Sequence, residues 1–302
     1  MNILCLTEKR NNQGAMTNGV KAAMAMQRLG HVVTICEHKY LSVDIIKAAD
    51  LIIAFGTLLY PYHTSQAKWI FENKRPGVKF ALWYFDACNP NSNYGGSGGK
   101  YQRIMAMIPY LDWLFTTDHS HSWEKHIKNY GHLLQGVDPD DFKFKVGPIE
   151  PRQADVIFTG CLRGDVDNRE RPLQLMAQNY TVARYGRGVY GSKFFAAHQK
   201  ARVVYVPPPP IEIRNKYWSN RIYLAAGTGT PCLVGYTPGI EDHYKADEEV
   251  IYFKNDLEMR TKLILLLGDE GLRKKIGNAG RIRTLRDHTY QVRCKQMLEI
   301  IK

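Results

Sequence analysis

The feature that most constrains the fold of this chain is a regular alternation of strand-like and helix-like segments. Short apolar runs with strand character occupy residues 2–6, 31–36, 51–55, 78–85 and 113–116, and helix-period segments such as residues 19–29 separate them. A β-α-β order of this kind predicts a parallel sheet that is covered by helices on both faces.

A second alternation follows residues 137–152, which are rich in Pro and Gly and lack periodicity, as is typical of a linker. Strands are expected at residues 154–159, 181–185, 203–206 and 232–234, helices at 171–179 and 217–227, and further helical structure at 256–302. The sequence thus predicts an α/β protein with two doubly wound Rossmann-like domains that face a central cleft. The expected domains are residues 1–145 and 146–302, and the last helix, about 289–302, is expected to pack back on the first domain.

Composition indicates a soluble protein of a reducing compartment. No apolar run approaches the roughly 18 residues that span a bilayer, and the first residues resemble a buried strand more than a secretory signal. The six cysteines are far apart and include no C-x-x-C pair, which argues against a disulfide framework or a cysteine zinc site. We therefore expect a cytoplasmic location.

The positive charge is concentrated in the second half of the chain. The net charge is +12, and Lys and Arg exceed Asp and Glu by 3 in residues 1–150 and by 9 in residues 151–302. An excess of this size favours a phosphorylated small molecule, a nucleic acid or an anionic membrane surface as partner. Charge alone does not distinguish these partners.

Candidate catalytic groups follow two strands of the first domain. Asp86 comes directly after the strand at 78–85, where a general base could reach an acceptor hydroxyl. His119, with Asp118 and His121, follows the strand ending at residue 117 and offers rival bases. The alternatives are that Asp86 is a turn or cap residue and that the histidines are ordinary surface groups. No third metal ligand accompanies the two histidines, so no metal site is expected.

Two loops of the first domain are candidates for ligand contact. Residues 11–19 join the first strand to the first helix, and Gly14 and Gly19 there allow backbone amides to approach a phosphate. Residues 89–103 are expected to form a flexible loop whose side chains suit stacking and phosphate contact: Tyr94, Lys100, Tyr101 and Arg103. Each segment could equally be a plain solvated turn.

Strand ends in the second domain carry residues suited to a nucleotide. Gly160 ends one strand, and Arg163 and Arg169 follow, where their planar guanidinium groups can each pair with two phosphate oxygens. Tyr185 and Gly186 end the next strand and leave room for a nucleobase. The alternative is a basic solvated turn.

Several short motifs, taken in order, resemble group 1 glycosyltransferases, and most closely the branch of spore-maturation-type proteins and phage enzymes. The main resemblance is in Asn220-Arg221-Ile222-Tyr223, Ala226-Gly227-Thr228-Gly229-Thr230-Pro231 and Pro238-Gly239-Ile240-Glu241. Supporting segments are residues 112–117, 135–138, 158–160, 185–186 and 288–290 together with Arg293. The resemblance covers nearly the whole chain.

This resemblance implies a GT-B fold in which the second domain holds a nucleotide-sugar donor and the first binds the acceptor. Arg163 or Arg169 would meet the diphosphate together with Arg221, and Tyr185 and Gly186 would flank the base. The run from Tyr217 to Pro231, which includes Asn220, would frame the donor, and Gly239, Ile240 and Glu241 would face the sugar. Asp86 would be the base of an inverting reaction. The chain departs from the family at Lys216 and Leu224, which stand where many members carry glutamates, so either another residue binds the ribose or the donor is held differently.

The leading hypothesis is transfer of a sugar from a nucleotide diphosphate sugar to an acceptor hydroxyl, with a UDP-sugar as the favoured donor. No metal ion and no permanent cofactor are expected. The favoured acceptor is a hydroxymethylated base in double-stranded DNA, in a host cytoplasm if the chain is phage-encoded. The basic residues of segment 273–295 are the expected DNA contacts. Alternatives are a cell-surface glycan or other small acceptor, a sugar-nucleotide epimerase, and a non-catalytic module that binds nucleotide sugar or DNA.

Overall fold

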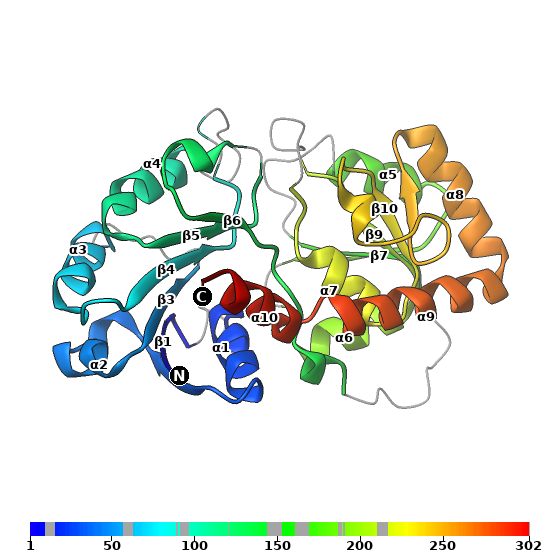
Figure 1. Cartoon of the computed structure of the whole chain (residues 1–302). Coiled ribbons are helices and arrows are strands. Elements are labelled where there is room, and N and C mark those ends of the chain that lie inside the picture. Colours follow the sequence, from blue (N-terminus) through cyan, green and yellow to red (C-terminus); the bar gives the residue numbers. More distant parts are fainter. Residues whose placement is uncertain are drawn as a thin grey trace. The chain divides into compact units, whose positions relative to one another are not determined.

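The chain forms two compact units, each built around a parallel sheet. The computed structural model describes residues 1–9, 16–56, 63–88, 90, 97–119, 121–143, 153–160, 169–186, 189, 191–209 and 217–301. Unit 1 comprises Met1–Gly136 and Tyr290–Lys302, and unit 2 comprises Val137–Thr289. Both are shown in Figure 1.

Unit 1 contains a six-stranded sheet of order β2-β1-β3-β4-β5-β6. Its strands are β1 (Asn2–Leu6), β2 (Val32–Cys36), β3 (Leu51–Phe55), β4 (Lys79–Tyr84), β5 (Trp113–Thr116) and β6 (Tyr130–His132). All neighbouring strands are parallel. The carboxyl ends of these strands therefore lie at one edge of the sheet, where ligands of such folds bind.

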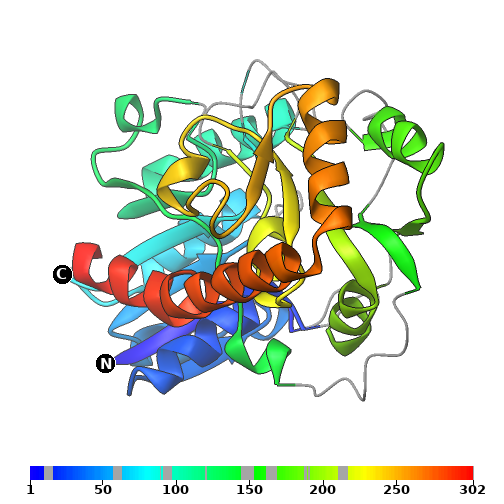
Figure 2. The same cartoon turned by 90° about the vertical axis from the view of Figure 1, so that its right-hand side faces the viewer.

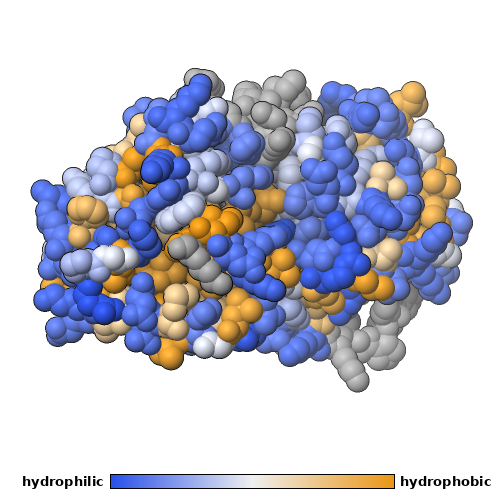
Figure 3. Space-filling model, viewed as in Figure 1, coloured by the Kyte–Doolittle hydropathy of each residue, from blue (hydrophilic) through white to orange (hydrophobic). Residues whose placement is uncertain are grey.

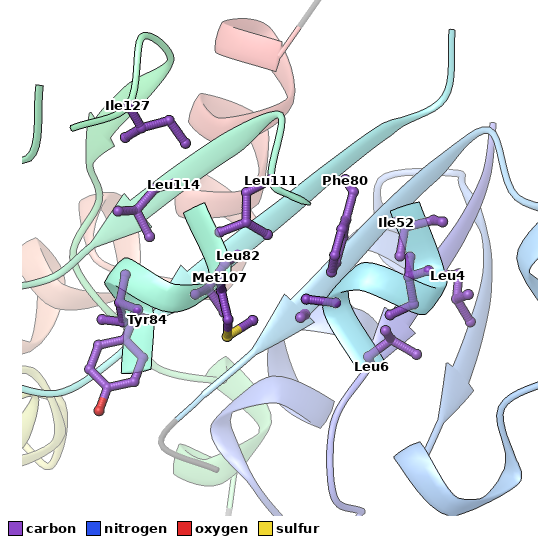
Figure 4. Close-up of a cluster of buried hydrophobic side chains, with 14 of the residues drawn as sticks. Leu4, Leu6, Ile52, Phe80, Leu82, Tyr84, Met107, Leu111, Leu114 and Ile127 are labelled. Atoms are coloured by element: carbon purple, nitrogen blue, oxygen red, sulfur yellow. The ribbon is translucent and has the colours of Figure 1, made fainter. Parts of the chain in front are cut away.

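Helices cover both faces of the unit 1 sheet. One face packs against α1 (Asn18–Arg28) and α10 (Tyr290–Ile301), and the other against α2 (Val43–Ala48), α3 (His63–Asn73) and α4 (Ser97–Met107). Figure 4 shows the core between the sheet and α2, α3 and α4, to which the sheet contributes Leu4, Ile52 and Leu82 and α4 contributes Met107. Because both faces are covered, the central strand β3 is buried throughout and consists only of apolar residues.

Unit 2 contains a five-stranded parallel sheet of order β11-β10-β9-β7-β8. Its strands are β7 (Ala154–Thr159), β8 (Val182–Tyr185), β9 (Ala201–Val206), β10 (Cys232–Gly235) and β11 (Ile251–Phe253). Its helices are α5 (Arg171–Ala177), α6 (Ser192–Gln199), α7 (Arg221–Gly227), α8 (Asp256–Gly268) and α9 (Glu270–Asp287). α5 and α8 cover one face, α6 and α7 cover the other, and α9 packs on α7 and α8 (Figures 1 and 2). The chain order of the sheet reverses between β7 and β9, which makes this position the topological switch point.

The boundary between the units lies at Gly136 and Val137, before the expected boundary at residues 145 and 146. The physical reason is Phe142, whose ring packs 4.7 Å from that of Phe195 and fills the space beside the backbone of Gly227. Residues 137–143 are thereby fixed to unit 2. At the other crossing, α10 returns to unit 1 and packs on α1, where the Cys294 thiol donates to the carbonyl of Ala22.

Two expected segments differ from the structure. Residues 97–103, expected within a flexible loop, belong to α4, because Tyr101, Ile104 and Met107 bury one helix face and this burial outweighs the poor helix propensity of the glycines at 98 and 99. The helix expected at 217–227 begins only at Arg221. Before it, Trp218 is buried and its indole N–H donates to the Tyr223 hydroxyl over 2.7 Å, which fixes this segment without helical structure. In the part of the chain that the structure describes, no helix is long and apolar enough to cross a bilayer.

Candidate active site

The turn that carries Asp86 is held at the carboxyl edge of the unit 1 sheet by its neighbours on both sides. The carbonyl of Phe85 accepts hydrogen bonds from the Thr117 hydroxyl (2.9 Å) and the Gln135 side-chain amide (2.7 Å). Farther along the turn, the backbone N–H of Cys88 donates to the Asp118 carboxylate over 2.8 Å. The peptide preceding Asp86 is thus fixed, and Asp118 is occupied by a structural bond in a fully buried position. These contacts favour Asp86 over Asp118 as a reactive carboxylate.

The Asp86 carboxylate forms an ion pair with Lys100. The Lys100 Nζ lies 2.9 Å from Asp86 Oδ2, and the side chains are 23% and 35% exposed, so the pair remains open to a ligand. Tyr101 is buried in the core, with its ring 5.2 Å from that of Trp123, which argues against acceptor binding. Arg103 is exposed on α4, and Tyr94 lies outside the described residues.

His119 lies in an aromatic cluster beside the same edge. Its Nδ1 is 3.5 Å from the Tyr130 hydroxyl, and its ring centroid is 4.9 Å from that of His132. Burial raises the pKa of Tyr130, which keeps this phenol protonated. The neighbouring His121 stacks on His126 with ring centroids 5.3 Å apart, and burial together with His126 lowers its pKa. His119 therefore stays a rival base beside Asp86.

The start of α1 lies at the same edge. Thr17 caps the helix by accepting from the backbone N–H of Val20, and the Asn18 amide donates to Gln135 Oε1 over 2.8 Å. Gly19 passes so close to Thr7 and Phe55 that a β-carbon would collide with both side chains. Packing alone thus explains Gly19, whereas Gly14 lies outside the described residues.

In unit 2, Gly160 and Arg221 meet at the carboxyl end of β7. Gly160 has a φ of +149°, and a β-carbon built on it would lie 2.6 Å from Arg221 Nη2. The Arg221 guanidinium also lies over the Phe158 ring, 5.5 Å from its centroid. Only glycine leaves room for the guanidinium here. A planar cation is thereby held at the switch point of the sheet, where a phosphate group could pair with it.

The edge continues to the exposed end of β8. The backbone N–H of Gly160 donates to the Tyr185 carbonyl over 2.9 Å, while the Tyr185 side chain is 37% exposed. Gly186 is also exposed, and a β-carbon there would meet nothing within 4 Å. Arg169 is half-buried just before α5, and Arg163 lies outside the described residues. Tyr185 and Gly186 therefore offer an open, stackable surface beside Gly160.

A carboxylate is organised in the turn after β10. Gly239 has a φ of +92°, and its backbone N–H donates to Glu241 over 2.9 Å. The Tyr236 hydroxyl donates to the other oxygen of Glu241 over 3.1 Å. Ile240, by contrast, is buried, and its carbonyl accepts from the Tyr252 hydroxyl, so its side chain cannot meet a ligand. Glu241 is the oriented acceptor group of this turn.

The run from Tyr217 to Pro231, which is expected to surround the donor, offers fewer exposed groups to a ligand than its motif predicts. Tyr217 is half-buried before the helix, and Asn220 stands at the start of α7 without a side-chain capping bond. Leu224 is half-buried on α7, and Lys216 lies outside the described residues. Arg221 is thus the residue of this run that the structure brings to the sheet edge.

The basic residues of segment 273–295 are mostly committed to contacts within the protein. Arg273 is buried and donates to the last carbonyls of α8, those of Leu266 and Leu267. Arg281 donates to the carbonyl of Gly227, and Arg283 to that of His243. The remaining partners are Asp287 for Arg283 and Arg286, Glu270 for Lys274, and Gln135 for the buried Arg293. Although hydrophilic residues predominate on the face shown in Figure 3, the expectation that this segment forms one DNA-binding surface is not supported by these contacts.

Sequence reasoning assigned no supporting role to three polar residues that stabilise the two edges: Asn18, Gln135 and His198. His198 of α6 is fully buried, with its Nε2 3.2 Å from the Thr159 hydroxyl at the end of β7. Burial lowers its pKa to about 3, so it is neutral at ordinary pH. No sequence signal marks these side chains, because their partners come from distant segments. Within the described ranges, the structure shows no group of three or more His, Cys, Asp or Glu residues arranged to hold a metal ion.

Comparison with known proteins agrees with this geometry. Residues 162–299 match the family described as glycosyl transferase-like. No curated protein matches the sequence significantly. Similar solved structures include an alpha-glucosyltransferase in complex with UDP and a 13-mer DNA containing a HMU base, with a TM-score of 0.74 and 10% identity over 100% of this chain and 99% of that chain.

Two further structures show the same fold. The Anabaena protein HepE in complex with UDP and glucose has a TM-score of 0.66 and 12% identity over 100% of this chain and 99% of its own. Sucrose-phosphate synthase from Thermosynechococcus elongatus has a TM-score of 0.67 and 10% identity over 99% of this chain and 98% of its own. The expected two-domain GT-B fold is confirmed. Residues 162–299 thus resemble a glycosyltransferase family, and the whole chain has the fold of GT-B glycosyltransferases.

Proposed function

We propose that the protein transfers a sugar from a UDP-sugar to an acceptor hydroxyl, with unit 2 binding the donor and unit 1 the acceptor. The observation that carries this proposal is the Arg221 guanidinium held against Gly160 at the switch point of unit 2. A diphosphate is the part of the donor that such a fixed, planar cation stabilises best, and it is also the leaving group of the reaction. Structures of the same fold contain UDP.

The remaining donor contacts follow from the order of groups along the edge. Tyr185 and Gly186 next to Gly160 would receive the base, and Arg169 with Arg163 would assist Arg221 at the diphosphate. Glu241 would accept hydrogen bonds from donor hydroxyls, because the Gly239 amide and Tyr236 hydroxyl already orient its carboxylate. Tyr217 and Asn220 are proposed as flanking contacts. No glutamate at 216 or 224 is then required.

In unit 1, Asp86 is the proposed general base and His119 its rival. A carboxylate whose backbone is fixed by bonds to Phe85 and Cys88 can be aimed at an acceptor hydroxyl with little reorganisation. Lys100 holds the carboxylate until an acceptor enters. This assignment corresponds to an inverting reaction, since direct displacement needs one base.

The test is turnover with a panel of nucleotide sugars, with and without EDTA. We expect one UDP-sugar to raise the Tm and to be consumed, and we expect EDTA to leave turnover unchanged. Binding without turnover in the presence of any tested acceptor would support a non-catalytic module, and conversion of the sugar without an acceptor would support an epimerase. Absence of both binding and turnover for the whole panel contradicts the proposal.

For the acceptor we favour a hydroxymethylated base in double-stranded DNA. Support comes from the net charge of +12 and from the DNA-bound alpha-glucosyltransferase that shares this fold. A base in a duplex must be flipped out to reach a catalytic carboxylate. The test compares transfer to hydroxymethylated and unmodified duplexes, with binding measured at several salt concentrations. Salt-independent or absent binding contradicts a DNA acceptor.

The second candidate is a surface glycan or another small acceptor. The observation that favours it is that Arg273, Arg281, Arg283 and Arg293 donate to backbone carbonyls within the protein, so fewer of the expected side chains are available to contact DNA phosphates. The same assay distinguishes the two, because transfer to a free sugar or nucleoside without any duplex requirement supports the small acceptor.

A further inference from the structure

Gln135 lies where four segments of unit 1 meet at the edge that carries Asp86. Its side-chain amide donates to the Phe85 carbonyl over 2.7 Å and accepts from Asn18 Nδ2 over 2.8 Å. Its own carbonyl accepts from Arg293 Nε of α10 over 3.5 Å. Gln135 thus connects the start of α1, the end of β4, the segment after β6 and the returning helix.

The orientation of the Gln135 amide is determined by its partners. The carbonyl of Phe85 can only accept, so it must face the NH₂ group, and the Asn18 amide nitrogen then donates to Oε1. The NH₂ group and the Oε1 atom of Gln135 therefore each bind a different partner. A glutamate, a methionine or a shorter amide therefore cannot reproduce the arrangement.

The bond to Phe85 acts on the peptide that immediately precedes Asp86. The carbonyl of this peptide receives one bond from Thr117 and one from Gln135, and these bonds fix the plane from which the Asp86 Cα projects. A rotation of that plane would move the carboxylate relative to an acceptor hydroxyl, and misplacements of about 1 Å can cost about 100-fold in rate. The bond to Asn18 ties the same peptide to the first residue of α1.

We propose that Gln135 is a positioning residue for the Asp86 carboxylate and for the first residue of α1, Asn18. This inference rests on the proposed function, because it presumes that Asp86 acts on the acceptor. Gln135 itself touches no reacting atom. Its effect is exerted through the peptide between Phe85 and Asp86.

The experiment compares Gln135→Met and Gln135→Glu in the full-length protein. Gln135→Met keeps the size of the side chain and removes both bonds, so kcat should fall at least tenfold, while the KM for the UDP-sugar should change less than about twofold because unit 2 holds the donor. Gln135→Glu keeps an acceptor for Asn18 but places a negative oxygen against the Phe85 carbonyl. It should also lower kcat, because the repulsion between these two oxygens displaces the peptide that precedes Asp86.

Asn129→Leu is the matched control. The Asn129 amide donates to the carbonyl of Asp112 over 3.0 Å, a bond of the same type and similar burial that precedes β5 and β6 and therefore lies at the opposite edge of the same sheet. This variant should lower the Tm by a similar amount and leave kcat unchanged.

The possible outcomes distinguish failure of the positioning role of Gln135 from failure of the proposed function. A wild-type enzyme that transfers sugar, together with Gln135 variants whose kcat matches that of Asn129→Leu, overturns the positioning role alone. A wild-type protein that transfers no sugar from any donor overturns the proposed function, and with it this inference. Should both Gln135 variants fail to fold, Asn18→Asp removes only the bond to Gln135 Oε1, and an unchanged kcat there would also contradict the proposal.

Discussion

The two sheet edges of this protein are organised in different ways. At the unit 1 edge, side chains fix a carboxylate: Thr117, Gln135 and Asp118 bind the backbone around Asp86, and Lys100 pairs with its side chain. At the unit 2 edge, glycines accommodate charged groups: Gly160 leaves room for the Arg221 guanidinium, and the backbone N–H of Gly239 donates to Glu241. The first arrangement suits a group that must be aimed, and the second suits the binding of a large polar ligand close to the backbone.

The largest effect is expected from Asp86→Asn. The amide cannot accept a proton, so kcat should fall by about 1,000-fold, within the range for loss of a general base. Because the donor is bound by unit 2, a UDP-sugar should raise the Tm of this variant as much as that of the wild type. His119→Gln is the control, with an expected loss of less than about tenfold. If His119→Gln causes the larger loss, the base is His119, and the fixed carboxylate of the unit 1 edge is not the catalytic group.

The next largest effect is expected from Gly160→Ala. The new methyl group would lie 2.6 Å from Arg221 Nη2 and displace the guanidinium, so the KM for the donor should rise roughly tenfold or more while the acceptor KM stays unchanged. Arg221→Met should reproduce this change without backbone strain. Gly268→Ala, at an exposed glycine with no atom within 4 Å, is the control. A donor KM that responds to Gly160→Ala but not to Arg221→Met contradicts the role of Arg221.

The sequence predicts the framework of both edges because burial dictates the strands. β3 is apolar along its whole length and β7 along most of its length, and Asp86 and Gly160 stand out directly after strands, whereas Arg221 begins a helix. The contacts among these residues are not predictable, since Gly160 and Arg221 become neighbours only when α7 packs beside β7. Tyr101 illustrates the opposite case: the glycines before it indicate a loop, but burial of Tyr101, Ile104 and Met107 favours a helix.

The basic segment shows a further limit of sequence reasoning. Counting charges between 273 and 295 indicates a binding surface, but Arg273, Arg281 and Arg283 donate to backbone carbonyls of other elements. Such partners have no sequence signature, because every residue has a carbonyl. The same holds for Gln135 and His198, whose bonds join segments far apart in the chain.

A smaller effect concerns stability at the unit 2 edge. Burial lowers the pKa of His198 from 6.5 to about 3, so the unfolded chain binds a proton between these values that the folded protein does not. Stability should therefore fall as the pH drops below about 6.5, by roughly 2 kcal/mol at pH 5 from this residue. His198→Gln should flatten that part of the stability curve measured by urea unfolding, whereas Gln27→Met, at an exposed glutamine of unit 1, should not. A wild-type curve that is flat between pH 5 and pH 7 argues against a neutral, buried His198.

The smallest effect is expected from the exposed lysines of α9, Lys274 and Lys275. Gly277, one turn farther on, packs against the carbonyl of Gly229, directly before β10, so these lysines lie near the amino edge of the sheet, away from Gly160. Lys274 pairs with Glu270 in an exposed ion pair, which contributes little to stability. The double variant Lys274→Gln/Lys275→Gln should change kcat/KM and the affinity for a modified duplex by less than about twofold at constant salt. A loss of duplex affinity above tenfold, with a smaller salt dependence and an unchanged Tm, would instead show that α9 contacts nucleic acid and that the acceptor surface extends beyond unit 1.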